Sequence, residues 1–239
     1  MTRRTLLGGA ALLPMSQAAG KPLHVVCVGG HPDDPESGCA GTLARYVETG
    51  HRVTIVYLTR GERGIAGKSN DEAAAIRTRE AEAACRILGA RAVFAGQIDG
   101  STEVNNDRTA EFRRLLAAQN PDAVFTQWPI DTHPDHEAAS LLTYRAWHAE
   151  GQRFPLYYFE VDLGSQTMAF SPNIYVDITA TREKKKAALF AHHSQNGEEI
   201  YRRHHKIMGD FRGRESGVVA AEAFVHLTRV SPVDRLPGL

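Results

Sequence analysis

Short apolar runs alternate with longer helical patterns along the chain, and this alternation limits the possible folds more than any other feature. Strands are predicted at 23–28, 52–58, 92–95, 123–126, 156–161, 174–178 and 223–230. Helices are predicted at 39–48, 71–88, 109–119, 134–150 and 181–193, with another helical segment after Glu198. Such alternation is typical of βαβ units. We therefore predict one α/β domain over residues 21–239, a three-layer Rossmann-like domain with a mostly parallel sheet.

Residues 1–20 have the pattern of an export signal. Arg3 and Arg4 precede a short apolar run, and small residues follow at 18–20. The adjacent arginines favour the twin-arginine route. The apolar run is interrupted by glycine and is shorter than the roughly 20 residues that a membrane span needs. We expect a periplasmic or extracellular protein without a stable membrane span, although an N-terminus with no targeting role would look similar.

Charge and cysteine content argue against a nucleic-acid partner and against a disulfide-stabilised fold. The formal net charge is 0, so no basic excess indicates a nucleic-acid partner. Cys27, Cys39 and Cys85 are scattered and form no C-x-x-C pair, which argues against a disulfide framework. Neither feature identifies a substrate.

Ionisable side chains follow the first predicted strand, where a nucleotide-binding protein would have a glycine-rich loop. The segment 29–36 reads Gly-Gly-His-Pro-Asp-Asp-Pro-Glu. Ligands of parallel sheets bind beyond the carboxyl ends of the strands. Carboxylates at that point would repel a pyrophosphate and attract a cation. The loop therefore predicts a cation site.

A second loop of the same kind follows the fourth predicted strand, and it carries His133, Asp135 and His136 around a helix start at Pro134. Imidazole and carboxylate together suit zinc, and a catalytic zinc has three protein ligands and an open position. We select His31, Asp34 and His136 as the ligands, which leaves Asp33 to take a proton from water. The alternative is that the aspartates only cap helices and the histidines are ordinary polar residues.

The two loops together resemble the N-acetylglucosaminyl-phosphatidylinositol de-N-acetylase family, also called PIG-L or LmbE-like deacetylases. The likeness lies in the GG-HPDD-x-E segment and the later P-x-D-x-HPDH segment. Weaker family segments follow in order at 58–62, 77–80 with 88–89, 99–100, 191–195 and 222–224. Some members that act on thiol-cofactor precursors have a tyrosine where this chain has Asp131, which argues against a role in thiol biosynthesis.

The resemblance implies one Zn²⁺ per chain, held by the same His31, Asp34 and His136, with Asp33 as general base. It also implies that His133 assists at the oxyanion or protonates the leaving amine, and that Asp135 orients His133. Iron or cobalt would fit the same ligands. The substrate-binding residues expected from the weaker segments are Arg77, Asp99, Glu62 and His192. The neighbouring His204 and His205 are predicted to lie on the surface.

The function that the resemblance implies is hydrolytic removal of an acetyl group from an N-acetylglucosamine-type sugar, which would be a small-molecule or oligosaccharide substrate. Three alternatives stay open: deacylation of another amide-bearing metabolite, a two-metal phosphate-ester hydrolase, and a non-catalytic exported sugar-binding protein. A two-metal site would need more bridging carboxylates than the two loops offer. A degenerate binding protein would be expected to have lost the base, which is present here as Asp33.

Overall fold

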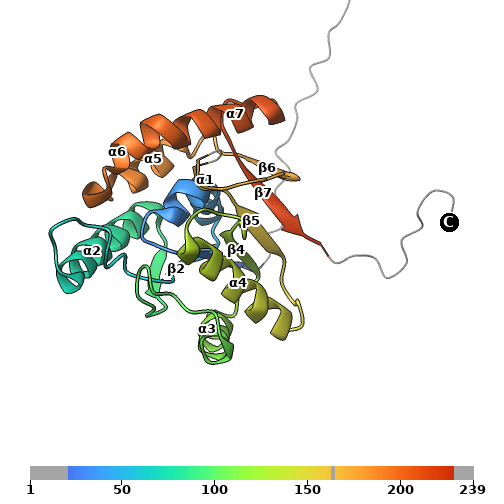
Figure 1. Ribbon diagram of the computed structural model, residues 1–239. Coiled ribbons are helices and arrows are strands. Elements are labelled where there is room, and N and C mark those ends of the chain that lie inside the picture. The colour runs from blue at the N-terminus through green and yellow to red at the C-terminus, as the bar shows by residue number, and fades with distance from the viewer. Residues whose placement is uncertain (1–20, 163–164, 229–239) are drawn as a thin grey trace, which may run out of the picture.

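One seven-stranded sheet organises the chain in the computed structural model, which describes residues 21–162 and 165–228 (Figure 1). The strand order is β3-β2-β1-β4-β5-β7-β6, and β7 runs antiparallel to its two neighbours. The mostly parallel α/β sheet predicted from the sequence is therefore confirmed. The strands are β1 (His24–Gly29), β2 (Arg52–Tyr57), β3 (Arg91–Phe94), β4 (Ala123–Gln127), β5 (Leu156–Phe159), β6 (Ile174–Asp177) and β7 (Ala221–Leu227).

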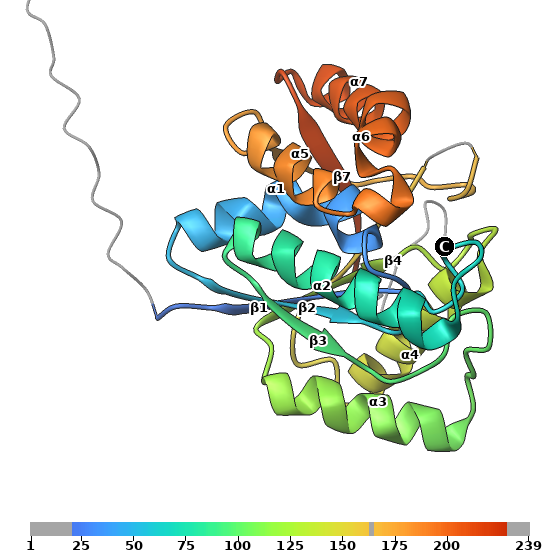
Figure 2. The ribbon, with the colours of Figure 1, turned by 90° about the vertical axis from the view of Figure 1, so that its left-hand side faces the viewer.

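Helices cover both faces of the sheet (Figure 2). One layer contains α1 (Asp34–Glu48), α2 (Asn70–Leu88), α5 (Arg182–Phe190) and α7 (Lys206–Ser216), and the other contains α3 (Asn106–Gln119) and α4 (Pro134–Ala149). Side chains of β1 alternate between the two layers: Val25 and Cys27 pack with Leu43 of α1, whereas Val26 and Val28 pack with Leu142 of α4. Because both faces are covered, this strand reads as a continuous apolar run.

The helix predicted at 39–48 begins five residues earlier, at Asp34. Pro35 suits the first helical turn, and the Glu36 side chain accepts a hydrogen bond from the backbone N–H of Asp33 at 3.3 Å. These capping interactions extend the helix back into the ionisable segment 29–36 that follows β1. Asp34 is therefore held by the first turn of a helix rather than by a free loop.

The helix predicted at 181–193 corresponds to α5, which ends three residues earlier at Phe190, and the helical segment predicted after Glu198 is divided. After α5 come a 3₁₀ turn (His193–Gln195), α6 (Gly197–Ile200), a π-helical turn (Tyr201–His205) and α7. The last strand begins two residues before its predicted start, and 229–230 of that prediction lie outside the described residues. The predicted export signal at 1–20 also lies outside them. Among the described helices, none is long and apolar enough to cross a membrane.

The sheet has a switch point between β1 and β4. From β1 the chain proceeds outward to β2 and β3, and then returns to place β4 on the other side of β1. Such a reversal opens a crevice at the carboxyl ends of the two central strands, where α/β proteins bind ligands. The two ionisable loops of the sequence follow these two strands.

Candidate functional site

A cavity of about 480 Å³ lies at the carboxyl ends of β1 and β4. Its volume suits a small ligand such as one or two sugar rings. Loops after β1, β2, β3 and β4 form one wall. Segments that follow β5 and α5 form the other, which we call the C-terminal wall. The lining residues are His31, Asp33, Asp34, Ser37, Arg63, Gly64, Arg77, Asp99, Gly100, His133, His136, Val161, Asp162, Gln166, Gln195, Ile200 and His205.

Three imidazoles and one carboxylate converge at the floor of this cavity. Ring nitrogens of His31, His133 and His136 all lie within 4.8 Å of one another. The Asp34 carboxylate oxygen Oδ2 is 3.2 Å from His31 Nδ1 and 3.2 Å from His136 Nε2. The structure thus brings together the three predicted ligands and adds His133 as a further candidate.

The two histidines of the predicted trio each use their second ring nitrogen on another carboxylate. His31 Nε2 is 3.0 Å from Asp135 Oδ2, and His136 Nδ1 is 3.1 Å from Asp131 Oδ1. Histidines that bind metals commonly donate their other N–H to a carboxylate, which fixes the ring tautomer and orientation. Because the inner nitrogens share Asp34 and the outer ones are anchored, the residues present fit a divalent cation.

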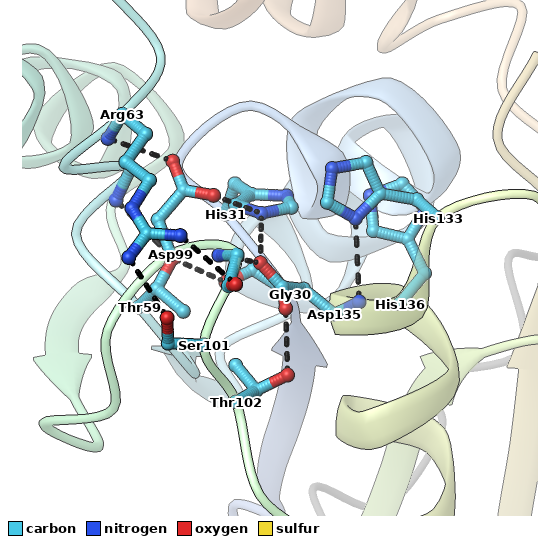
Figure 3. A network of polar contacts seen from close by, with 12 residues as sticks. Gly30, His31, Thr59, Arg63, Asp99, Ser101, Thr102, His133, Asp135 and His136 are labelled. Carbon is cyan, nitrogen blue, oxygen red and sulfur yellow. Dashed lines mark hydrogen bonds and ion pairs between the residues drawn. The ribbon is translucent and has the colours of Figure 1, made fainter.

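The Asp135 side chain contacts His31, and its predicted role in orienting His133 stays a prediction. Its carboxylate accepts hydrogen bonds from the Gly100 backbone N–H at 2.7 Å and the Thr102 hydroxyl at 2.6 Å, beside the contact with His31 (Figure 3). Asp135 lies in the first turn of α4, where its backbone N–H donates to the capping residue His133. Its carboxylate also lies within 4.8 Å of a His133 ring nitrogen. Burial would raise the pKa of the Asp135 carboxyl, but these hydrogen bonds hold it below its usual range.

Asp33 is held in a strained backbone conformation beside a buried arginine. Its φ of 115° is unusual for a non-glycine residue, and such strain is found at functional sites. Arg77 Nη2 lies 3.1 Å from Asp33 Oδ2. Burial raises the pKa of Asp33 to about 6, although Arg77 acts in the opposite direction. A methyl group at Gly61 or Gly64 would overlap the Arg77 guanidinium, so these glycines permit its approach.

His133 presents one ring nitrogen to the cavity. Its Nδ1 accepts a hydrogen bond from the Asp135 backbone N–H at 3.3 Å, so the neutral ring carries its proton on Nε2 (Figure 3). Burial lowers the pKa of His133, and the neighbouring His31 and His136 lower it further. The arrangement provides a neutral hydrogen-bond donor beside the cluster.

The predicted substrate contacts divide into two groups. Arg77 and Asp99 line the cavity, whereas Glu62 and His192 do not. Glu62 is buried and accepts a hydrogen bond from the Asp99 backbone N–H at 3.1 Å, so it supports Asp99 from behind. His192 is completely buried, with Nε2 3.6 Å from Glu36, and does not reach the cavity. The family resemblance implied a binding residue, but its burial beside Glu36 of α1 makes it part of the support.

Sequence reasoning missed Asp131, Asp162 and His205 as parts of the site. In the sequence, Asp131 stands out only as a departure from a family pattern. Its position two residues before His133 in the same loop could have indicated a contact with that loop's histidines. His205 was expected on the surface, yet it is 2% exposed and lines the cavity. No periodicity could have placed it, because the residue lies in a π-helical turn.

Comparisons with known proteins find a matching family model and similar sequences. A family model described as GlcNAc-PI de-N-acetylase matches residues 10–147. Diacetylchitobiose deacetylase from Thermococcus kodakarensis is 30% identical over 192 residues, which cover 74% of this chain and 72% of that protein. The probable N-acetyl-alpha-D-glucosaminyl L-malate deacetylase 2 of Bacillus anthracis is 30% identical over 190 residues, covering 74% and 83%.

The fold is shared with a solved structure as well. That structure is the N,N'-diacetylchitobiose deacetylase from Pyrococcus horikoshii, which superposes with a TM-score of 0.75 over 87% of this chain and 84% of its own. The two sequences are 24% identical, so this likeness shows the fold alone.

Proposed function

The chain belongs to the GlcNAc-PI de-N-acetylase (PIG-L) family, and we propose that it hydrolyses the acetamide group of an N-acetylglucosamine-type sugar with the help of a divalent cation. Membership makes it a deacetylase, a hydrolase of carbon–nitrogen bonds in amides. The observation that carries the finer proposal is the position of Asp33 beside the convergent His31, Asp34 and His136 in a cavity of sugar size.

We assign one Zn²⁺ to His31, Asp34 and His136. Two imidazoles and one carboxylate form the usual ligand set of a catalytic zinc with an open position. When bound there, the ion would supply Lewis acidity, lowering the pKa of a nearby water and polarising the acetyl carbonyl. Asp131 and Asp135 would fix the orientation of the two histidines.

Asp33 and His133 carry the proton transfer and the charge stabilisation. As water adds to the acetyl carbon, the Asp33 carboxylate takes one of its protons. The His133 Nε2–H donates a hydrogen bond to the carbonyl oxygen as that oxygen becomes negative. Asp33 returns its proton to the nitrogen as the carbon–nitrogen bond breaks. The products are acetic acid and the free amine, which together contain every atom of the amide and the water and then ionise to acetate and an ammonium group.

Two further side chains that line the cavity serve the substrate. Asp99 would accept hydrogen bonds from sugar hydroxyls, since its carboxylate faces the cavity and its backbone is fixed by Glu62. Arg77 also lines the cavity and could hydrogen-bond to a sugar hydroxyl. Its main contribution is to orient the base, because it forms an ion pair with Asp33.

We also propose that residues 1–20 direct export, so that the deacetylase works in the periplasm or outside the cell. The proposal rests on the paired arginines, the short apolar run and the small residues that follow it. Cell fractionation with sequencing of the N-terminus of the exported protein tests it. Full-length protein confined to the cytoplasm would contradict it.

The deciding experiment measures acetate release from N-acetylglucosamine and N,N'-diacetylchitobiose by the zinc-loaded protein and its Asp33→Asn variant. Loss of the general base should reduce kcat by about 10²–10⁴-fold, or about 3–5 kcal/mol in barrier, while zinc content is kept. Asp107→Asn, on the exposed first turn of α3, is the matched control. No acetate from either sugar would contradict the sugar substrate, and an active Asp33→Asn would contradict the assigned base.

A further inference from the structure

The C-terminal wall of the cavity contains the inward-facing imidazole of His205. The π-helical turn Tyr201–His205 lies between α6 and α7, and π-helical turns occur frequently at functional sites. Its last two residues are both histidines with opposite environments: the His205 side chain is 1% exposed and lines the cavity, whereas the His204 side chain is 40% exposed.

His205 faces a carboxylate with which it makes no aligned hydrogen bond. His205 Nε2 lies 3.0 Å from Asp162 Oδ1, but the geometry leaves both ring nitrogens and this oxygen without a hydrogen-bond partner among the described residues. Asp162 also has a φ of 46°, in the left-handed region that non-glycine residues rarely occupy. Buried polar atoms are nearly always paired, so unpaired ones in a cavity wall indicate a ligand.

The rest of this wall is well fixed. Arg212 donates two hydrogen bonds to Glu160, at 2.7 and 2.8 Å, and so holds the segment that carries Asp162. The backbone carbonyl of Asp162 accepts hydrogen bonds from the N–H groups of Ser165 and Gln166. Neither set of contacts uses the Asp162 Oδ1 atom that faces His205. His204 Nδ1 lies 3.7 Å from the same oxygen, beyond hydrogen-bond distance. The pair is therefore positioned by its surroundings, and its buried polar atoms keep unused hydrogen-bonding capacity.

The chemistry of the pair selects a hydroxyl group as its ligand. One imidazole and one carboxylate are too few for a structural metal site, and the carboxylate would repel an anion. Burial lowers the pKa of His205, so the ring is neutral and offers one donor and one acceptor. A hydroxyl can donate to Asp162 Oδ1 and accept from a His205 N–H at the same time.

We propose that Asp162 and His205 form a hydroxyl-binding subsite that holds a ring hydroxyl of the sugar substrate. This inference rests on the proposed function, because it assumes that the acetamide lies at the imidazole cluster while the sugar ring extends toward the C-terminal wall. The subsite makes the enzyme prefer a saccharide over a simple amide. It acts on substrate binding and takes no part in the proton transfers.

The first test compares His205→Phe and Asp162→Asn with the parent on N-acetylglucosamine and on N-ethylacetamide, which has no hydroxyl. Loss of a buried hydrogen bond to the substrate should raise KM for the sugar about tenfold and leave kcat within about twofold. The kcat/KM for N-ethylacetamide should not change. His148→Phe, the same substitution at an exposed histidine of α4, should behave as the parent. Zinc content and thermal unfolding of each variant exclude misfolding.

A panel of monodeoxy N-acetylglucosamines identifies the hydroxyl and tests the pairing directly. Dissociation constants are measured by calorimetry in the Asp33→Asn background, where hydrolysis is slow. One deoxy sugar should bind about tenfold more weakly than N-acetylglucosamine, and His205→Phe should abolish that difference. Equal losses with and without His205→Phe would overturn the subsite.

The outcomes separate the subsite from the proposed function. Acetate release by the parent, with KM and dissociation constants unchanged in His205→Phe, would overturn the subsite and leave the deacetylase function standing. Binding of N-acetylglucosamine without hydrolysis, weakened tenfold by His205→Phe, would overturn the sugar deacetylase function and support the subsite. A parent that neither binds nor cleaves the sugar would overturn both.

Discussion

The two walls of the cavity are built in different ways. The strand-end wall comprises His31, Asp33, Asp34, His133 and His136, which follow β1 and β4. Here each imidazole and carboxylate has a partner, and outer carboxylates anchor two of the rings. The C-terminal wall, with Asp162, Gln166, Gln195, Ile200 and His205, comes from turns and short helices, and it leaves buried polar atoms unpaired.

This difference separates the reaction from the choice of substrate. Strand ends of a packed sheet hold side chains rigidly, which suits groups that must meet a cation and a scissile bond within a few tenths of an ångström. Irregular connections can change in sequence and length without disturbing the sheet, so substrate selection is more often found there. In the proposed function, the unpaired polar atoms of the C-terminal wall gain their hydrogen-bond partners from the substrate. The side chains of the strand-end wall are already paired before the substrate binds.

The largest expected effect comes from removing one of the assigned ligands. His136→Ala should lose bound zinc and reduce acetate release to the detection limit, because the remaining ligands no longer enclose the ion. Metal analysis after dialysis and an acetate assay check both results. His148→Ala, an exposed histidine on the same helix α4, should keep zinc and activity. A His136→Ala protein with normal zinc would exclude His136 as a ligand.

Neutralising a carboxylate that anchors a histidine should cause a smaller loss of zinc affinity or activity. Asp131→Asn keeps the shape of the side chain but removes the charge that faces His136 Nδ1 at 3.1 Å. Such anchoring groups typically contribute 10–100-fold to metal affinity or activity. Competition with a zinc chelator measures the affinity, and Asp107→Asn serves as the control. Unchanged affinity would show that Asp131 only supports its loop, through the hydrogen bond to the His133 backbone.

The strand-end wall could largely be predicted from the sequence, since its residues are local to two loops. The alternation of elements placed both loops at one edge of the sheet, and the residue types then indicated a cation. The partner of Asp135 could not be predicted in this way. Its contact with His31 joins residues 104 positions apart and depends on the direction that α4 takes at its first turn.

The C-terminal wall could not be predicted, for a physical reason that His205 illustrates. Helical periodicity assigns faces on the assumption of 3.6 residues per turn, and a π-helical turn breaks that assumption. The sequence pattern predicted a helical segment after Glu198 and a surface position for both histidines. The structure divides this segment into α6, the π-helical turn and α7, and the π-helical turn places His205 at the cavity.

Acidification should reduce activity through the strand-end wall. Burial raises the pKa of Asp33 to about 6, and a general base works only when it is deprotonated. The value of kcat/KM should therefore fall about tenfold per pH unit below that pKa. A bound cation would lower this pKa, so the fall should begin at pH 6 or below. Arg77→Gln should move it to higher pH, because the ion pair favours the carboxylate. A fall that persists in the residual activity of Asp33→Asn would assign the titration to another group.

The smallest expected effect is the coupling between the walls, measured by double-mutant cycles on kcat/KM. Asp33 and His205 share no hydrogen-bond partner among the described residues, and they act on different steps. Their substitutions should add within about 0.5 kcal/mol. Arg77 acts mainly through Asp33, so Arg77→Gln should change little in the Asp33→Asn background, although it is harmful alone. Strong coupling of His205→Phe with Asp33→Asn would show that His205 also acts on the reacting group, and the distinction between a reacting and a selecting wall would then be wrong.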